Sequence, residues 1–454
     1  MKLNEDLSRW LKAGAEQYQV PGASIAVLRG GRVTGAAAGV INLDTAVPTT
    51  LDTVFQIGSI TKIFTTTLIM QLVDEGRLDL DEPVVTYLPS FRVADLSVSR
   101  QVTPRHFLSH QSGIDGDFFV DAGRGDDSVE KLVEMAVMLP SLFAPGAKHS
   151  YCNLGFALLG RLAEVLTRRT YDELLRERIF EPLGMRHAIS LPEDTLRFRS
   201  AIGHVPSRRK KNTWYVTRTP YLSHGQKAAG STPAMAVTDL LKFAKMHMAE
   251  GRTDAGDRML SVRSVAAMQK RQVALPAHTR NCIKHWGLGW FLMDWQGTRL
   301  YGHDGATMGQ FAYLRVIPEQ QLAVAMLTNG GDAGGLYKDI FDKVFLRLAR
   351  TCEPAAPVAA KVSRLQRDDY VGSYANLNQR YDIVRKGETL LISLTQNGGG
   401  TGLPARSKLA FIDRRTAILQ SGDPVLDRSV FHFSEPADTG YGYLATGLRQ
   451  YRRT

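Results

Sequence analysis

The chain has 454 residues, enough for two or three domains, and 44% hydrophobic with 22% charged residues is typical of a globular protein. The net charge is +11, but the basic residues are spread along the chain rather than gathered into a nucleic-acid-binding stripe. No run of about 18 apolar residues occurs, so no transmembrane helix is predicted. We therefore expect neither a nucleic acid nor a membrane as a partner.

The cysteines and the N-terminal residues indicate in which cellular compartment the protein is expected. Cys152, Cys282 and Cys352 are odd in number and widely separated, which fits neither a disulfide framework nor a zinc ribbon. The first twenty residues mix acidic, basic and apolar side chains at helical spacing, without the apolar core of a secretory signal. A cytoplasmic location is the simplest expectation, unless a leader has been removed.

The N-terminal elements are predicted to be a helix and a β-hairpin, followed by a long helical insertion. Residues 23–29 and 32–40 are β-like and flank Gly30-Gly31, a turn typical of a hairpin. From residue 61 to 72 the apolar pattern becomes helical, and helices dominate to about residue 249. The helical half is expected to span about residues 57–250.

Strand-like runs return after the insertion. They cover residues 298–303, 311–318 and 322–328, and a closing helix is predicted at 338–350. Neither strand group is large enough to form a stable sheet alone. We expect the two groups to pair into one antiparallel sheet within a single domain, residues 1–350.

The C-terminal region differs in pattern. Residues 351–364 are rich in proline and alanine, which is typical of a linker. Residues 365–454 alternate polar and apolar side chains in short runs separated by Gly and Asn turns. This pattern predicts a small all-β domain, barrel-like in form.

A candidate nucleophile lies at the start of the first inserted helix, in Ser59-Ile60-Thr61-Lys62. A serine hydroxyl is a poor nucleophile until a base removes its proton. Lys62 is one helical turn away on the same face, and burial would lower its pKa enough for it to act as that base. The backbone N–H of Ser59, at a helix start, can point at a developing oxyanion. Taken alone, however, this four-residue pattern usually marks a helix cap with a surface lysine.

The surrounding sequence strengthens the interpretation. The segment FQIGSITKIFTTTLIMQLVDEG closely resembles the nucleophile helix of the serine β-lactamase and penicillin-binding-protein superfamily, including its Ser-x-x-Lys signature. The resemblance is closest to the class C β-lactamase-like branch, which also contains D-aminopeptidases, carboxypeptidases, esterases and acyltransferases. It continues through PRHFLSHQSGI, ERIFEPLGM and LTNGG and covers about residues 5–350.

Two further motifs follow from this resemblance. Tyr151-Cys152-Asn153 looks like the Tyr-x-Asn motif of the branch. Tyr151 would then move protons between Ser59, Lys62 and the leaving group, and Asn153 would bind a substrate amide carbonyl. Outside this context the same residues would be a core tyrosine and a helix-capping asparagine. Cys152 is interpreted as a packing thiol.

The second motif is His303-Asp304-Gly305-Ala306, in the position where many members carry Lys-Thr-Gly. His303 would replace the lysine, the N–H of Ala306 would complete the oxyanion hole with that of Ser59, and Asp304 and Gly305 would support the motif. Without the family context this is a turn before a hairpin. A neutral histidine lacks the permanent charge of lysine. Efficient β-lactam hydrolysis is therefore not expected, and esters, D-amino-acid amides or thioesters are favoured.

One histidine pair has the spacing of a metal site. His106 and His110 have the i, i+4 spacing of zinc ligands on a helix, but Phe107 occupies the place of the glutamate in His-Glu-x-x-His. We predict no metal and no cofactor.

The resemblance implies a β-lactamase/transpeptidase-like α+β (α/β) fold: an antiparallel sheet flanked by helices, with an all-helical insertion and an active cleft between the halves. The tail resembles lipocalin-like barrels. The predicted function is a serine hydrolase or acyltransferase that forms an acyl-enzyme on Ser59 and acts on amide, ester or thioester bonds, with a small-molecule or peptidyl substrate containing D-amino acids, or a small ester.

The sequence leaves three alternative functions open. One is a penicillin-binding-protein-type thioesterase that cyclises peptides, for which the basic charge would suit an acidic carrier-protein domain as partner. The second is a true class C-like β-lactamase. The third, from a different class, is a sensor that is acylated once or only binds its ligand.

Overall fold

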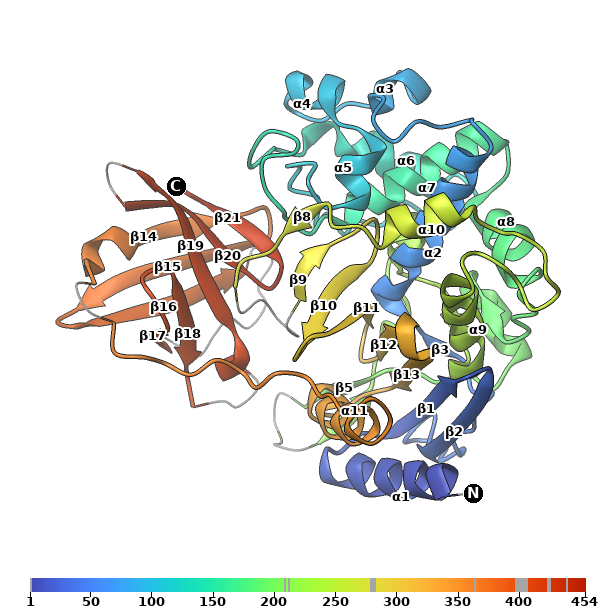
Figure 1. The fold of residues 1–454 in the computed structure, drawn as a ribbon. Helices are drawn as coiled ribbons and strands as arrows, with labels where there is room; N and C mark the ends of the chain where they lie inside the picture. Colours follow the sequence, from blue (N-terminus) through green and yellow to red (C-terminus); the bar gives the residue numbers. More distant parts are fainter. Residues whose placement is uncertain are drawn as a thin grey trace.

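The structure is a computed structural model, which describes residues 2–207, 210, 213–277, 283–362, 365–396, 407–422, 426–437 and 440–454. Cys282 and the last two residues of the predicted linker, 363 and 364, lie outside the described residues. Figure 1 shows a large body of helices and strands with a β-barrel beside it.

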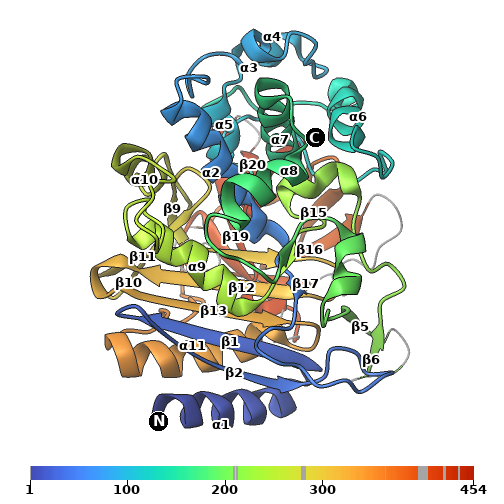
Figure 2. The same ribbon diagram turned by 90° about the vertical axis from the view of Figure 1, so that its right-hand side faces the viewer.

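An antiparallel sheet forms the centre of the larger body (Figures 1 and 2). Among the described residues its eight strands are, from edge to edge, β2 (Arg32–Gly39), β1 (Gly22–Arg29), β13 (Leu322–Thr328), β12 (Phe311–Ile317), β11 (Thr298–Ala306), β10 (Phe291–Trp295), β9 (Ile283–Trp286) and β8 (Val273–Ala274). β1 pairs with β13, so that Ala23 lies opposite Thr328. The predicted pairing across the insertion is confirmed, whereas β8, β9 and β10 were not predicted.

Both faces of the sheet are covered, which explains why every residue of β13 is buried. On β1, Ile25 and Val27 pack with the two terminal helices, α1 (Lys2–Gln17) and α11 (Ala333–Ala349). Ala26 and Leu28, on the opposite face, belong to the core shared with the inserted helices. This two-residue alternation is that of a β-strand between two apolar layers.

The inserted segment is mainly helical. Its helices are α2 (Thr61–Asp74), α3 (Val84–Tyr87), α4 (Leu96–Gln101), α5 (Pro104–Leu108), α6 (Ser128–Glu134), α7 (Asn153–Thr167), α8 (Tyr171–Leu175), α9 (Val237–Met248) and α10 (Val262–Met268). Short helical turns accompany them: η1 (Gly58–Ile60), η2 (Met135–Met138), η3 (Arg176–Phe180), η4 (Pro192–Arg197) and η5 (His224–Ala229). Residues 61–72 of α2 are all buried, so this helix is the central one.

Short strands also occur in the insertion, which the sequence predicted to be all-helical. β3 (Phe55–Gln56), β7 (Ala234–Met235) and β4 (Ala188–Ile189) form a small sheet, and β5 (His204–Pro206) pairs with β6 (Trp214–Val216). β3 leads directly into η1 and α2, and therefore helps to place the start of α2.

The C-terminal region forms a closed barrel. Its eight described strands are β14 (Gly372–Ala375), β15 (Gln379–Lys386), β16 (Thr389–Gln396), β17 (Ser407–Phe411), β18 (Thr416–Gln420), β19 (Val430–Ala437), β20 (Gly440–Thr446) and β21 (Arg449–Arg453). Pairing of β14 with β21 closes the barrel and leaves no sheet edge open. Residues 351–362, between α11 and the barrel, contain no helix or strand. Among the helices that the structure describes, none is both long enough and apolar enough to cross a bilayer.

Candidate active site

Ser59 and Lys62 are brought together by local helix geometry. Ser59 lies in η1, and Lys62 lies in the first turn of α2. The Lys62 Nζ atom is 3.1 Å from Ser59 Oγ, 2.8 Å from Asn153 Oδ1 and 2.6 Å from the carbonyl oxygen of Ala229. The Lys62 side chain is completely buried, so its amine is removed from water.

This burial changes the proton affinity of the lysine. It lowers the pKa of Lys62 from 10.5 to about 7, while the charge of Asp117 raises that pKa and the charge of Arg449 lowers it. Desolvation disfavours the charged form of an amine, so a large fraction of Lys62 is neutral near pH 7. A neutral amine beside Ser59 can accept the hydroxyl proton.

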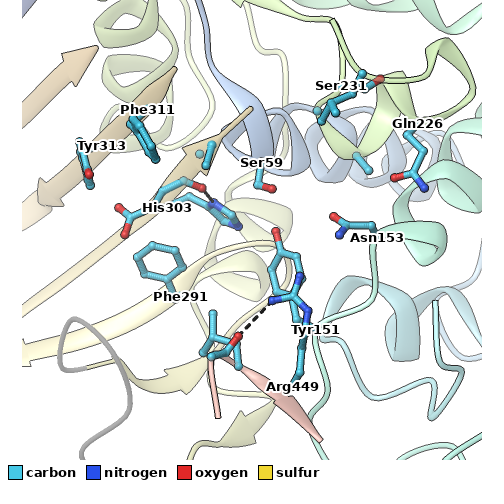
Figure 3. A pocket seen from close by; sticks show the side chains of 18 of the residues that line it. Ser59, Tyr151, Asn153, Gln226, Ser231, Phe291, His303, Phe311, Tyr313 and Arg449 are labelled. Carbon is cyan, nitrogen blue, oxygen red and sulfur yellow. Dashed lines mark hydrogen bonds between the residues drawn. The ribbon is translucent and has the colours of Figure 1, made fainter. Parts of the chain in front are cut away.

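Tyr151 lies just before α7 and completes this group (Figure 3). Its ring centroid is 4.9 Å from Lys62 Nζ, and it stacks on the His110 ring at 4.2 Å. Burial raises the pKa of Tyr151 well above its usual value, against an opposing effect of the hydrogen bond to Ser59. The phenol is therefore protonated at rest and can act as a proton donor.

Asn153 is the first residue of α7 and uses both ends of its side-chain amide. Its Oδ1 accepts from Lys62, and its Nδ2 donates to Asp117 Oδ1 at 2.6 Å. The Nδ2 group has a second hydrogen, which can be donated to a substrate carbonyl as the sequence suggested.

His303 lies on β11 with only 2% of its surface exposed. Burial lowers its pKa to about 3, and the charge of Lys62 acts in the same direction, so the imidazole is neutral. Its Nδ1 is 2.6 Å from the backbone oxygen of Asp304, which identifies Nδ1 as the protonated nitrogen. Nε2 is then an acceptor, and it has no hydrogen-bond partner among the described residues.

The proposed oxyanion hole depends on close contact between two backbone segments. A Cβ added to Gly58 would lie 2.5 Å from the Ala306 nitrogen, and one added to Gly305 would lie 1.8 Å from the Ile57 oxygen. Glycine is required at both positions because the chains approach so closely. The contact brings the N–H-bearing segments of Ser59 and Ala306 to the same wall of the pocket.

Asp304 has a structural partner on the neighbouring strand. Its Oδ1 accepts from Nη1 of Arg315 on β12 at 2.6 Å, and Arg315 Nε also donates to the hydroxyl of Tyr337 on α11 at 3.1 Å. Arg315 is completely buried. These contacts anchor the end of β11 beside His303. The supporting role of Asp304 in the motif stays a prediction.

The residues form one pocket of about 300 Å³ between the sheet, the inserted helices and the barrel. Figure 3 shows Ser59, Tyr151, Asn153 and His303 converging on it.

The barrel contributes residues to the pocket that were not predicted from the sequence, Gly447, Leu448 and Arg449. Arg449 carries no motif and has further arginines close by in the same strand. Asp117 was also missed, although it lies only three residues after the recognised segment PRHFLSHQSGI.

The two candidate zinc-spaced histidines make other contacts. His106 Nδ1 accepts from the backbone N–H of Thr103 at 3.2 Å, and His110 Nδ1 accepts from that of Cys152 at 3.0 Å. In the described part of the chain, no three His, Cys, Asp or Glu side chains are grouped to hold a metal ion. Cys152 is 1% exposed, and burial raises its thiol pKa to about 12, which fits a packing role.

Both the fold and the arrangement around Ser59 are those of the serine β-lactamase and penicillin-binding-protein superfamily. Within it, the model of the Beta-lactamase family matches residues 7–347, and the chain belongs to that family.

Individual relatives extend this result. Penicillin-binding protein 4 of Amycolatopsis lactamdurans is 42% identical over 348 residues, covering 76% of this chain and 90% of that protein. A D-aminopeptidase of Brucella anthropi is 28% identical over 342 residues, 73% of this chain but only 61% of that protein. The crystal structure of SurE aligns with a TM-score of 0.82 and 25% identity over 99% of both chains, and so includes the barrel. These matches support serine hydrolase or acyltransferase activity.

Proposed function

We propose that this protein is a serine hydrolase or acyltransferase that forms an acyl-enzyme on Ser59. The observation that carries the proposal is the state of Lys62, which is buried 3.1 Å from Ser59 Oγ. The other deeply buried lysine of this region, Lys227, donates to the carboxylate of Asp172 at 2.6 Å. Lys62 contacts only neutral oxygens among the described residues. A lysine without a carboxylate partner is suited to give and take protons.

The acylation step follows from these positions. Neutral Lys62 accepts the proton of Ser59, and the serine oxygen bonds to the substrate carbonyl carbon. The carbonyl oxygen gains the electron pair and is stabilised by the N–H groups of Ser59 and Ala306. As the intermediate collapses, Tyr151 donates its proton to the leaving group, and Lys62 returns the proton it holds to Tyr151.

Release of the acyl group repeats the sequence with a second nucleophile. Water gives hydrolysis, whereas an amine or alcohol gives acyl transfer. The acceptor loses its proton to the same Lys62–Tyr151 pair, and the proton returns to Ser59 as the ester bond breaks. The neutral His303 lines the pocket and has Nε2 as an acceptor, so it can orient an N–H or O–H of the substrate or of the acyl acceptor.

For substrates, we propose D-amino-acid-containing peptides or small esters, cleaved at amide, ester or thioester bonds. The similarity to a D-aminopeptidase supports the first group. The neutral state of His303 supports both groups over β-lactams, because it offers no fixed charge to a substrate carboxylate.

A peptidyl thioester on an acidic carrier domain is the second candidate substrate. The net charge of +11 favours it, because a basic surface attracts an acidic carrier. This proposal is tested by comparing turnover of one peptidyl group as a free thioester and as a carrier-bound thioester at low and high salt. The cytoplasmic location that such a partner requires stays a prediction, which fractionation of the native cell tests.

The acyl-enzyme is tested with a fluorophosphonate probe, followed by intact-mass analysis and peptide mapping. We expect one adduct, on Ser59, and none in Ser59→Ala. An adduct on another residue, together with continued turnover in Ser59→Ala, would refute the mechanism.

The substrate class is tested on one preparation with nitrocefin, p-nitrophenyl esters and D-alanyl p-nitroanilide. We expect larger kcat/KM values for the esters and the D-amino-acid amide. Nitrocefin hydrolysis near the diffusional limit would identify a β-lactamase instead, and a single acylation without turnover would identify a sensor.

A further inference from the structure

The carboxylate of Asp117 contacts Asn153, the residue whose side-chain oxygen accepts a hydrogen bond from Lys62. Asn153 presents Oδ1 to Lys62 Nζ at 2.8 Å and Nδ2 to Asp117 Oδ1 at 2.6 Å. A side-chain amide has an acceptor end and a donor end. A carboxylate on the donor side therefore permits only the orientation in which the oxygen faces Lys62. Rotation of the amide by 180° would place its oxygen against the Asp117 carboxylate and bring two acceptors together.

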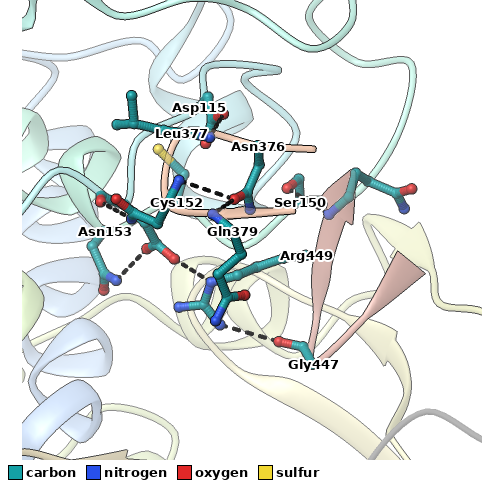
Figure 4. Close-up of polar contacts among 12 residues, drawn as sticks. Asp115, Ser150, Cys152, Asn153, Asn376, Leu377, Gln379, Gly447 and Arg449 are labelled. Atoms are coloured by element: carbon teal, nitrogen blue, oxygen red, sulfur yellow. Dashed lines mark hydrogen bonds and ion pairs between the residues drawn. The ribbon is translucent and has the colours of Figure 1, made fainter. Parts of the chain in front are cut away.

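Asp117 is itself held by the barrel at two points. Its Oδ2 forms an ion pair with Arg449 Nε, and its backbone oxygen accepts from the side-chain amide of Asn378. Arg449 begins β21, and Asn378 directly precedes β15. Figure 4 shows this series of contacts from Asn153 through a carboxylate to Arg449. Asp117 is only 8% exposed and is not among the described residues that line the pocket, so it acts through Asn153 rather than on the substrate.

We propose that Asp117 is a positioning residue of this site, which sets the orientation of the Asn153 amide towards Lys62 and is anchored on the barrel through Arg449. The inference rests on the proposed acyl-enzyme function. It also assigns a task to the barrel: the barrel arginine holds the carboxylate that orients the active-site asparagine.

The charges around Lys62 provide a specific test. Asp117 and Arg449 are the charged side chains that act on it, and the Cys152 thiol adds a smaller effect. Tyr151, His110 and His303 also face Lys62, and all three are neutral because burial disfavours their charged forms. Asp117 raises the pKa of Lys62, and Arg449 lowers it. Removing one or the other must therefore move the pH profile in opposite directions.

The experiment measures kcat and KM for a p-nitrophenyl ester across pH in four variants. Asp117→Asn keeps an acceptor for Asn153 Nδ2 but loses the charge, and Asp117→Ala loses both. Arg449→Gln removes the opposing charge. The double variant Asp117→Asn/Arg449→Gln removes both charges and leaves no unpaired ion, so it protects the test against misfolding of the single variants.

We expect the rise of kcat/KM with pH to shift to lower pH in Asp117→Asn and to higher pH in Arg449→Gln. The double variant should shift to lower pH, but less than Asp117→Asn, because Asp117 has the larger effect. Asp117→Ala should in addition lose about tenfold in kcat above that rise, where Lys62 is already neutral, as expected for loss of one hydrogen bond to a charged group.

A matched control separates positioning from barrel docking. Lys148 and Glu435 form another ion pair between the inserted segment and the barrel, and neither lines the pocket. Glu435→Gln should leave both the pH profile and kcat unchanged. A Glu435→Gln profile shifted like that of Asp117→Asn, or Asp117 variants that behave like wild type, would overturn the inference. If Ser59→Ala is inactive in the same assay, the proposed function stands in either case; if it is active, that function fails independently.

Discussion

The two walls of the pocket differ in how they balance buried charge. On the nucleophile wall, Lys62 is completely buried with neutral hydrogen-bond partners, and its pKa falls to about 7. On the barrel wall, the buried carboxylate of Asp117 is paired with the half-buried Arg449. Desolvation lowers the pKa of Arg449, but the charge and the hydrogen bond of Asp117 act against it, so the pKa is raised overall and the guanidinium stays charged. Under the proposed mechanism, burial without a counter-ion prepares a group for proton transfer, whereas burial with a counter-ion holds geometry.

The strongest test of this contrast replaces two buried lysines: Lys62, which has no carboxylate partner among the described residues, and Lys227, which is paired with Asp172. Lys62→Ala should lower kcat/KM by about 10²- to 10⁴-fold, the usual effect of losing a general base, without lowering the melting temperature. Lys227→Ala should instead lower the free energy of unfolding by about 3–5 kcal/mol, because Asp172 is left buried without its partner. Thermal unfolding and ester hydrolysis are to be measured on both variants. Normal turnover of the ester by Lys62→Ala would contradict the contrast.

Tyr151→Phe tests the proton donor on the same wall. The ring can still stack on His110, so we expect a folded protein. Turnover of D-alanyl p-nitroanilide should fall by about 10²- to 10⁴-fold. The loss should be smaller for a p-nitrophenyl ester, because p-nitrophenolate leaves without a proton. Equal losses for both substrates would argue that Tyr151 acts before the leaving group departs.

The pH dependence of the wild type tests the unpaired lysine directly. Burial lowers the pKa of Lys62 to about 7, and in the proposed mechanism the neutral amine is the active form. The value of kcat/KM should therefore rise with pH through about 7, by tenfold per pH unit below it, and then level off. A profile that is flat from pH 5 to 9 under acylation-limited conditions would remove Lys62 as the base.

Introducing a fixed charge at the position of His303 on β11 should have a smaller effect. His303→Lys should increase kcat/KM for nitrocefin by roughly tenfold, the difference between a hydrogen bond to a charged group and one to a neutral group. Hydrolysis of an uncharged p-nitrophenyl ester, measured in parallel, should not increase. A decrease for both substrates would show that the neutral imidazole is needed for more than substrate recognition.

The smallest effect is expected for cleavage of the connection to the barrel. Limited proteolysis should cut between Arg350 and Arg364, where the residues described from 351 to 362 form no helix or strand. The fragments should co-elute and remain active, because contacts such as Tyr151 N–H to Leu448 O, at 2.9 Å, still hold the barrel. Separation of the fragments with full activity would show that the barrel wall is dispensable.

Much of the fold could be predicted because its signals are local. Two β-like runs on either side of Gly30-Gly31 indicated the hairpin of β1 and β2, and the sheet pairs as expected. β8 to β10 were missed since they are short: β8 has two residues and β9 four. The short strands inside the insertion were missed for the same reason, because two or three residues do not establish a period.

In the candidate site, too, the contacts between residues close in sequence could be predicted, whereas those between distant residues could not. Ser59 and Lys62 are three residues apart, so the geometry of one helical turn determines their distance, and the sequence by itself was sufficient to pair them. Arg449 and Asp117 are 332 residues apart in the chain, and neither belongs to a motif. Only docking of the barrel against the inserted helices brings them together. Tertiary structure also decided the pKa of Lys62, because desolvation depends on the residues that surround the helix rather than on the helix itself.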